Sequence, residues 1–250
     1  MYIVWITALG VGGATLFGSV LGFVFKNISR RFSDVVLSFA AGIMLAAAVI
    51  GLILPSLDGG GVWRLVITLI GIFLGALSLV LFDRLVPHIS DLIAKKDHSA
   101  PERKRLESVL LFVTAIAVHN LPEGIAAGVA FGTGNTVEAL TVAFGIAVQN
   151  IPEGMVIIAP MLASGISVTK TVFIAVLTGV IEIVGTLIGY CAVGISSAIL
   201  PLALAFAGGT MLFIISDEMI PETHPEGRGR YATFSLLAGF ALMLVVSHCF

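Results

Sequence analysis

The motif His119-Asn120-Leu121-Pro122-Glu123-Gly124 is repeated almost unchanged as Gln149-Asn150-Ile151-Pro152-Glu153-Gly154. Each copy lies inside a long apolar segment. Residues i and i+4 share one face of an α-helix, so we expect His119 over Glu123 and Gln149 over Glu153. Asn120 and Asn150 follow about 100° further round their helices, still on the inward flank.

The prolines add a second feature to each phrase. Pro122 cannot donate to the carbonyl of Val118, and Pro152 cannot donate to that of Val148, so each helix is expected to kink and leave a carbonyl free. The two helices then carry imidazole, carboxylate and amide oxygen on bent, polar patches. These groups suit a borderline divalent cation such as zinc or ferrous iron.

The composition indicates an integral membrane protein. The 250 residues are 58% hydrophobic and 11% charged, against about 25% charged residues in soluble domains, and the mean hydropathy is +1.11. Spanning segments must satisfy their backbone internally, as helices or closed barrels do. The long unbroken apolar runs do not fit the alternating pattern of barrels. The sequence therefore predicts an all-α integral membrane fold.

About 20 apolar residues cross a bilayer, and the sequence divides into eight such segments. They form one transmembrane domain over residues 1–250, with spans at about 3–25, 35–57, 65–82, 108–131, 138–164, 168–191, 197–219 and 231–250. The third span is expected to continue as helix beyond the membrane. A connector at about 84–107 is the one substantial loop.

Basic residues set the orientation of this eight-helix bundle. When the loops are assigned alternately to two sides, Arg64 stands alone on one side and the other 12 of the 13 Lys and Arg residues fall on the other. The positive-inside rule makes the basic side cytoplasmic and both termini extracytoplasmic. Glycine pairs at helix-packing spacing predict close helix contacts: Gly18 and Gly22, Gly71 and Gly75, Gly185 and Gly189.

Carboxylates inside the membrane are the main functional signal. Glu123, Glu153 and Glu182 lie well within predicted spans, and the one basic residue inside a predicted span, Lys170, lies at the very end of its span, too far out to neutralise them. Ionised groups there cost at least about 2.5–3.5 kcal/mol and normally mark a pathway or a site. The carboxylates are protonated, exposed to water, or balanced by a bound cation. The last option explains why His119 and two asparagines share their helix faces.

Each candidate also has a structural reading. His119, Asn120, Gln149 and Asn150 can serve as interhelical hydrogen-bonding groups, and Glu182 can relay protons. Met44, in the second span, is more often a packing residue than a soft metal ligand. Four polar residues near the end of the seventh span either line an exit path or form a solvated helix end: Asp217, Glu218, Glu222 and His224. Asp58 attracts cations at the outer mouth or simply ends a helix.

The paired phrase, eight spans and external termini resemble the Zrt- and Irt-like (ZIP) divalent metal transporters, most closely the prokaryotic branch related to GufA. The resemblance covers the whole chain and implies a binuclear site at the bundle centre. One metal would be held by Met44, His119, Glu123, Gln149 and Glu153. The other would be held by Asn120, Asn150, Glu153 and Glu182.

The resemblance also implies that Asp217 and Glu218 line a release path and that Asp58 lies near the entrance. It implies alternating access, in which spans one, four, five and six slide against the rest, and a homodimer. Two positions depart from the family pattern. Many members have His in place of Gln149, and some have Asp in place of Asn150, which bears on selectivity and on the affinity of the second site.

These observations predict a carrier that moves Zn²⁺ into the cytoplasm, with iron, manganese, cobalt and cadmium as further substrates. Its partners would be divalent metal ions and the lipid bilayer, with no nucleic acid, and its location the plasma membrane, as a bacterial inner-membrane protein. Protons are expected to occupy the empty site, so acid pH should weaken metal binding. It is not expected to be an enzyme.

The residues leave two other functions open. The first is an intramembrane metallohydrolase, although no His-Glu-x-x-His motif is present. The second is a proton- or sodium-coupled carrier of another solute that uses the same carboxylates.

Overall fold

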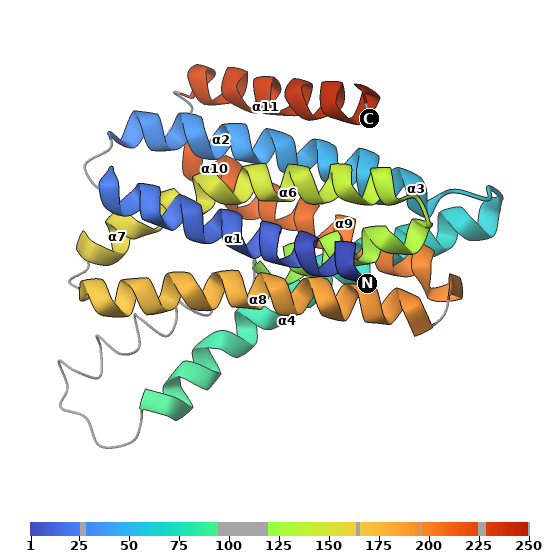
Figure 1. Ribbon diagram of the computed structural model, residues 1–250, viewed down its shortest axis with the longest axis horizontal. Coiled ribbons are helices and arrows are strands. Elements are labelled where there is room, and N and C mark those ends of the chain that lie inside the picture. The colour runs from blue at the N-terminus through green and yellow to red at the C-terminus, as the bar shows by residue number, and fades with distance from the viewer. Residues whose placement is uncertain (26–28, 95–119, 164–165, 196, 225–228, 250) are drawn as a thin grey trace.

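The computed structural model describes residues 1–25, 29–94, 120–163, 166–195, 197–224 and 229–249. All regular secondary structure in these ranges is helical, and the long helices lie roughly alongside one another in a bundle (Figure 1). The N- and C-termini lie toward the same end of the bundle.

The first half of the chain forms α1 (Tyr2–Val24), α2 (Arg30–Ala46) and α4 (Val62–Ala94). Ser29 caps α2, because its side chain accepts a hydrogen bond from the backbone nitrogen of Phe32. A π-helical stretch (Ala47–Ile53) and the short α3 (Leu54–Ser56) extend α2. The expected continuation of the third span as helix is confirmed, since α4 runs on to Ala94.

The second half begins with helical residues 120–129 and a 3₁₀ turn (Ala130–Thr133). Next come α6 (Thr136–Val156), capped by Asn135, and α7 (Ile158–Ala163). The chain continues as α8 (Val168–Ile195), a 3₁₀ turn (Ser197–Ile199) and α9 (Leu200–Ile214). A π-helical stretch (Ile215–Met219), α10 (Ile220–Thr223) and α11 (Arg230–Cys249) complete it.

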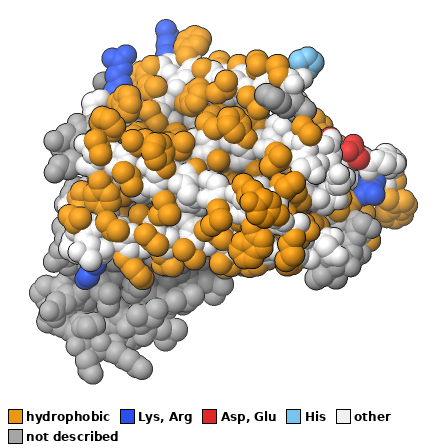
Figure 2. Space-filling view, viewed as in Figure 1, with side chains coloured by type: hydrophobic (Ala, Val, Ile, Leu, Met, Phe, Trp, Pro, Cys, Tyr) orange, Lys and Arg blue, Asp and Glu red, His pale blue; other side chains and the backbone are white. Residues whose placement is uncertain are grey.

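Seven described helices are long and apolar enough to cross a membrane. They are Tyr2–Val24, Arg30–Ser56, Val62–Phe82, Thr136–Val156, Val168–Gly194, Leu200–Thr223 and Arg230–Cys249. Much of the expected fourth span, at about 108–131, lies outside the described residues, so the count of eight stays a prediction. The visible surface is largely apolar, with basic side chains toward its margins (Figure 2).

The fifth predicted span is shorter than expected, because the helix is interrupted at Ile157, between α6 and α7. Pro160 lacks the N–H that would bond to the carbonyl of Val156, and Pro152 lacks the one for Val148. Helix α6 continues through Pro152 and ends at Val156, the residue whose carbonyl Pro160 leaves without a helical donor.

Glycines allow the helices to approach closely, as the sequence predicted. A Cβ on Gly18 would collide with the carbonyl of Ile151, which brings α1 against α6. A Cβ on Gly75 of α4 would collide with the carbonyl of Phe206 on α9. A Cβ on Gly189 of α8 would collide with the carbonyl of Ile125 in helical residues 120–129. The three predicted glycine pairs all lie at such contacts, so this prediction is confirmed.

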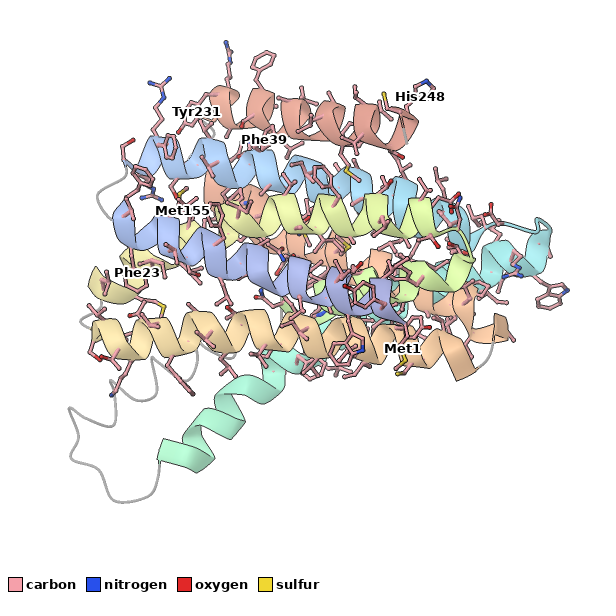
Figure 3. The ribbon with its side chains drawn as sticks, in the orientation of Figure 1. Met1, Phe23, Phe39, Met155, Tyr231 and His248 are labelled. Atoms are coloured by element: carbon pink, nitrogen blue, oxygen red, sulfur yellow. The ribbon has the colours of Figure 1, made fainter. Side chains whose placement is uncertain are left out.

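The contact between α2 and α11 includes polar interactions at its basic end. The Tyr231 hydroxyl donates a hydrogen bond of 3.1 Å to the buried carboxylate of Asp34. The Arg31 guanidinium lies 4.9 Å from the centre of the same ring. Tyr231 lies near the start of α11 and His248 near its end (Figure 3). These contacts fix α11 against α2 outside the predicted metal site.

Candidate metal centre

The buried carboxylate of Glu182, on α8, receives hydrogen bonds from three other helices. The Thr15 hydroxyl of α1 lies 2.7 and 2.8 Å from its two oxygens. Nδ2 of Asn120 donates to Oε1, and Nδ2 of Asn150 donates to Oε2 over 2.9 Å. We call these four residues the Glu182 cluster. Hydrogen bonds to charged groups contribute about 1.5–3 kcal/mol each, so the cluster stabilises a carboxylate deep in an apolar bundle.

A second group forms around Glu123. Nε2 of Gln149 donates a hydrogen bond of 2.8 Å to Oε1 of Glu123, and both side chains are buried. Glu153, one helical turn beyond Gln149, is partly exposed and is close enough to Glu123 for the two carboxylates to interact electrostatically. We call Glu123, Gln149 and Glu153 the Glu123 cluster.

Buried oxygens in these clusters lack a hydrogen-bond partner among the described residues. They include Oε2 of Glu123, Oε1 of Gln149 and Oδ1 of Asn150. Buried polar atoms are normally paired, so each of these calls for a partner that is not a described side chain. A divalent cation is such a partner, because it binds oxygen lone pairs and compensates carboxylate charge.

The motif glycines place the two clusters next to each other. A Cβ on Gly124 would collide with the backbone carbonyl of Glu182, and one on Gly154 would collide with that of Thr15. Each glycine therefore lets the helix bearing its motif glutamate approach a helix of the Glu182 cluster. Sequence spacing alone did not indicate this role.

Two further predicted ligands, Met44 and His119, belong to neither cluster. Met44 is fully buried in α2, just before the π-helical stretch, and His119 lies outside the described residues. In the described part of the chain, no three His, Cys, Asp or Glu side chains gather closely enough to hold a metal ion. A site built on Glu123 and Glu153 would therefore need ligands of other kinds, or ligands from outside the described residues.

The predicted pathway residues lie on other elements than the two clusters. Asp58 is exposed in the turn after α3. Asp217 is exposed and Glu218 is partly buried in the π-helical stretch after α9, and π-helical segments often occur at functional sites. His224, by contrast, is held structurally: its ring nitrogens lie 3.0 Å from the hydroxyls of Thr223 and Thr233.

Thr15 is the member of the site that the sequence did not indicate. Thr178, Thr186 and Thr210 bond carbonyls of their own helices, as threonines in apolar helices commonly do. Nothing in the local sequence separates Thr15 from these three. Only the packing of α1 against α6 and α8 brings its hydroxyl to Glu182.

Comparison with known proteins gives a consistent picture. The sequence profile described as ZIP Zinc transporter matches residues 94–247. The chain is 40% identical to Zinc transporter ZIPB of Bordetella bronchiseptica, over 92% of this chain and 76% of that protein. It is 39% identical to Zinc transporter GufA of Myxococcus xanthus, over 96% of both chains.

More distant relatives also align along most of their length. Zinc transporter ZIP11 of Homo sapiens is 29% identical over 93% of this chain and 92% of that protein. The profile match covers more than half of the chain, and GufA of Myxococcus xanthus aligns with it almost from end to end. The helical bundle, its buried carboxylates and these matches agree: the chain belongs to the ZIP zinc transporter family.

Proposed function

We propose that this protein carries Zn²⁺ across a membrane into the cytoplasm and binds it at the Glu123 cluster. The observation that carries the proposal is a pair of buried oxygens, Oε2 of Glu123 and Oε1 of Gln149, which have no hydrogen-bond partner in the described part of the chain and lie in one cluster with Glu153. Relatives aligned over most of this chain are named zinc transporters, which supports zinc as the substrate.

In the proposed binding step, zinc exchanges water for oxygens of Glu123, Gln149 and Glu153. His119, one turn before Glu123 in sequence, would add an imidazole, and Met44 a thioether. Glu153 is the most exposed member of the cluster, which makes it the natural first contact for a hydrated ion. Iron, manganese, cobalt and cadmium prefer overlapping ligands, so they belong to the proposed substrate range.

The proposed topology has eight crossings with both termini outside. The termini lie toward the same end of the bundle (Figure 1), which supports an even number of crossings. Seven candidate spans and one further crossing that contains helical residues 120–129 satisfy this condition. A bacterial inner membrane, alternating access and a homodimer complete the proposal on the strength of the family relationship.

The test is zinc uptake into proteoliposomes that enclose a zinc-sensitive dye. Wild type should take up zinc, whereas Glu153→Ala and Glu123→Gln should fall to the leak of protein-free vesicles, because each loses a charged ligand. Glu138→Gln, which changes an exposed glutamate in the first turn of α6, is the matched control and should retain uptake. Equal uptake by wild type and both cluster variants would reject the proposed site.

A further inference from the structure

The Glu182 cluster leaves little room for a second metal ion. Both carboxylate oxygens of Glu182 already accept hydrogen bonds from Thr15, Asn120 and Asn150. A carboxylate offers about four lone-pair positions, and three donor groups face these two oxygens: one N–H of each asparagine and the single hydroxyl hydrogen of Thr15, which lies within reach of both. Both oxygens of Glu182 therefore already face protein donors.

The orientation of Asn150 argues in the same direction. Its Nδ2 donates to Oε2 of Glu182 over 2.9 Å and to the carbonyl of Val11 over 3.3 Å. An asparagine binds metal through Oδ1, because its NH₂ group has no lone pair to offer. Turning Oδ1 toward Glu182 would break both hydrogen bonds and bring the oxygen against a carboxylate and a carbonyl. Asn150 therefore faces Glu182 as a donor, and its Oδ1, which has no hydrogen-bond partner among the described residues, is the amide atom turned away from Glu182.

The amide also changes the charge of this part of the bundle. An aspartate at position 150 would face Glu182 with a second carboxylate and no N–H to donate, and two adjacent buried carboxylates favour a cation between them. Asn150 supplies a donor in that position and removes one negative charge. The described residues also bring no third carboxylate, histidine or cysteine together with Glu123 and Glu153 as a metal-holding group.

We propose that Glu182 is a positioning residue, held by Thr15, Asn120 and Asn150, and that the chain binds a single zinc ion at the Glu123 cluster. This inference rests on the proposed function and makes it more specific. Glu182 orients the two asparagine amides from its place on α8, and the asparagines belong to the helices that carry Glu123 and Glu153. Asn150 determines the number of ions, because its NH₂ group stands where a second cation would be needed.

The test is the zinc content of the purified full-length chain after equilibrium dialysis against zinc in detergent. The double variant Glu123→Gln/Glu153→Gln gives the background of zinc bound elsewhere on the surface. Above this background, wild type should hold one zinc ion per chain and Asn150→Asp should hold two. Two ions in wild type, or no gain in a folded Asn150→Asp protein, would overturn the inference.

A second measurement keeps the inference testable if Asn150→Asp does not fold. Glu182→Gln retains an acceptor oxygen but loses the charge that a zinc ligand would contribute. Its zinc dissociation constant should stay within about threefold of wild type, whereas loss of a true carboxylate ligand should weaken binding by tenfold or more, the equivalent of about 1.4 kcal/mol. A tenfold loss in Glu182→Gln would identify Glu182 as a ligand and reject its positioning role.

The outcomes separate this inference from the proposed function. Two zinc ions in wild type, with loss of one in Glu182→Gln, would leave zinc transport standing and reject only the single-ion site. No zinc above background in wild type would reject the binding site of the proposed function, and the single-ion site with it.

Discussion

Gln149 illustrates how much one side chain depends on its neighbours. On its own helix it lies one turn before Glu153, yet its amide donates to Glu123 on another helix. Because that hydrogen bond uses Nε2, Oε1 is left toward the interior without a partner among the described residues. The spacing of the motif predicted which helix face Gln149 would occupy. It could not predict the partner, which depends on how the helices pack.

Thr15 carries a prediction at the same scale. Thr15→Val keeps the shape of the side chain but removes the hydroxyl that donates to Glu182, so the buried carboxylate loses a charge-assisted hydrogen bond. We expect the free energy of unfolding to fall by about 1.5–3 kcal/mol. Thr15→Ser retains the hydroxyl and should stay nearer to wild type. Thermal unfolding in detergent measures both, and equal stability of the two variants would show that the hydrogen bond contributes nothing.

At the scale of the helix, small residues determine how closely two elements approach. Gly18 and Gly13 are both on α1, but a Cβ on Gly18 would collide with the Ile151 carbonyl of α6, whereas one on Gly13 would meet nothing within 4 Å. The glycine spacing in the sequence predicted these contacts correctly. The sequence predicted a kink at Pro152, whereas the helix is interrupted at Ile157, next to the carbonyl that Pro160 leaves without a donor.

The two glycines form a matched pair for mutation. Gly18→Ala should lower the free energy of unfolding by about 1–3 kcal/mol, since the added methyl group forces α1 and α6 apart. Gly13→Ala should be neutral or stabilising by up to about 1 kcal/mol, because alanine favours the helix and the space is open. The melting temperatures of the two variants, measured side by side, test this. Similar shifts in both would contradict the close contact between α1 and α6.

At the scale of the whole molecule, composition and hydropathy predicted the helical membrane bundle, because burial of apolar length dominates such a sequence. For the polar interior, the sequence predicted which residue types would be present but not how they contact one another. Asn120, Asn150 and Glu182 were expected among the ligands of the second metal, and they do meet in the structure. The two asparagine amides donate hydrogen bonds and the Glu182 carboxylate accepts them. That distinction depends on which amide atom faces the carboxylate, which no sequence pattern encodes.

The most direct measurement is anomalous X-ray scattering at the zinc absorption edge from crystals grown with zinc. The account predicts one strong peak inside the bundle, among the side-chain oxygens of Glu123, Gln149 and Glu153. Glu182 should keep its hydrogen bonds to Thr15, Asn120 and Asn150 in the same crystals. A zinc peak coordinated by Glu182, or no peak at the Glu123 cluster, would contradict the account.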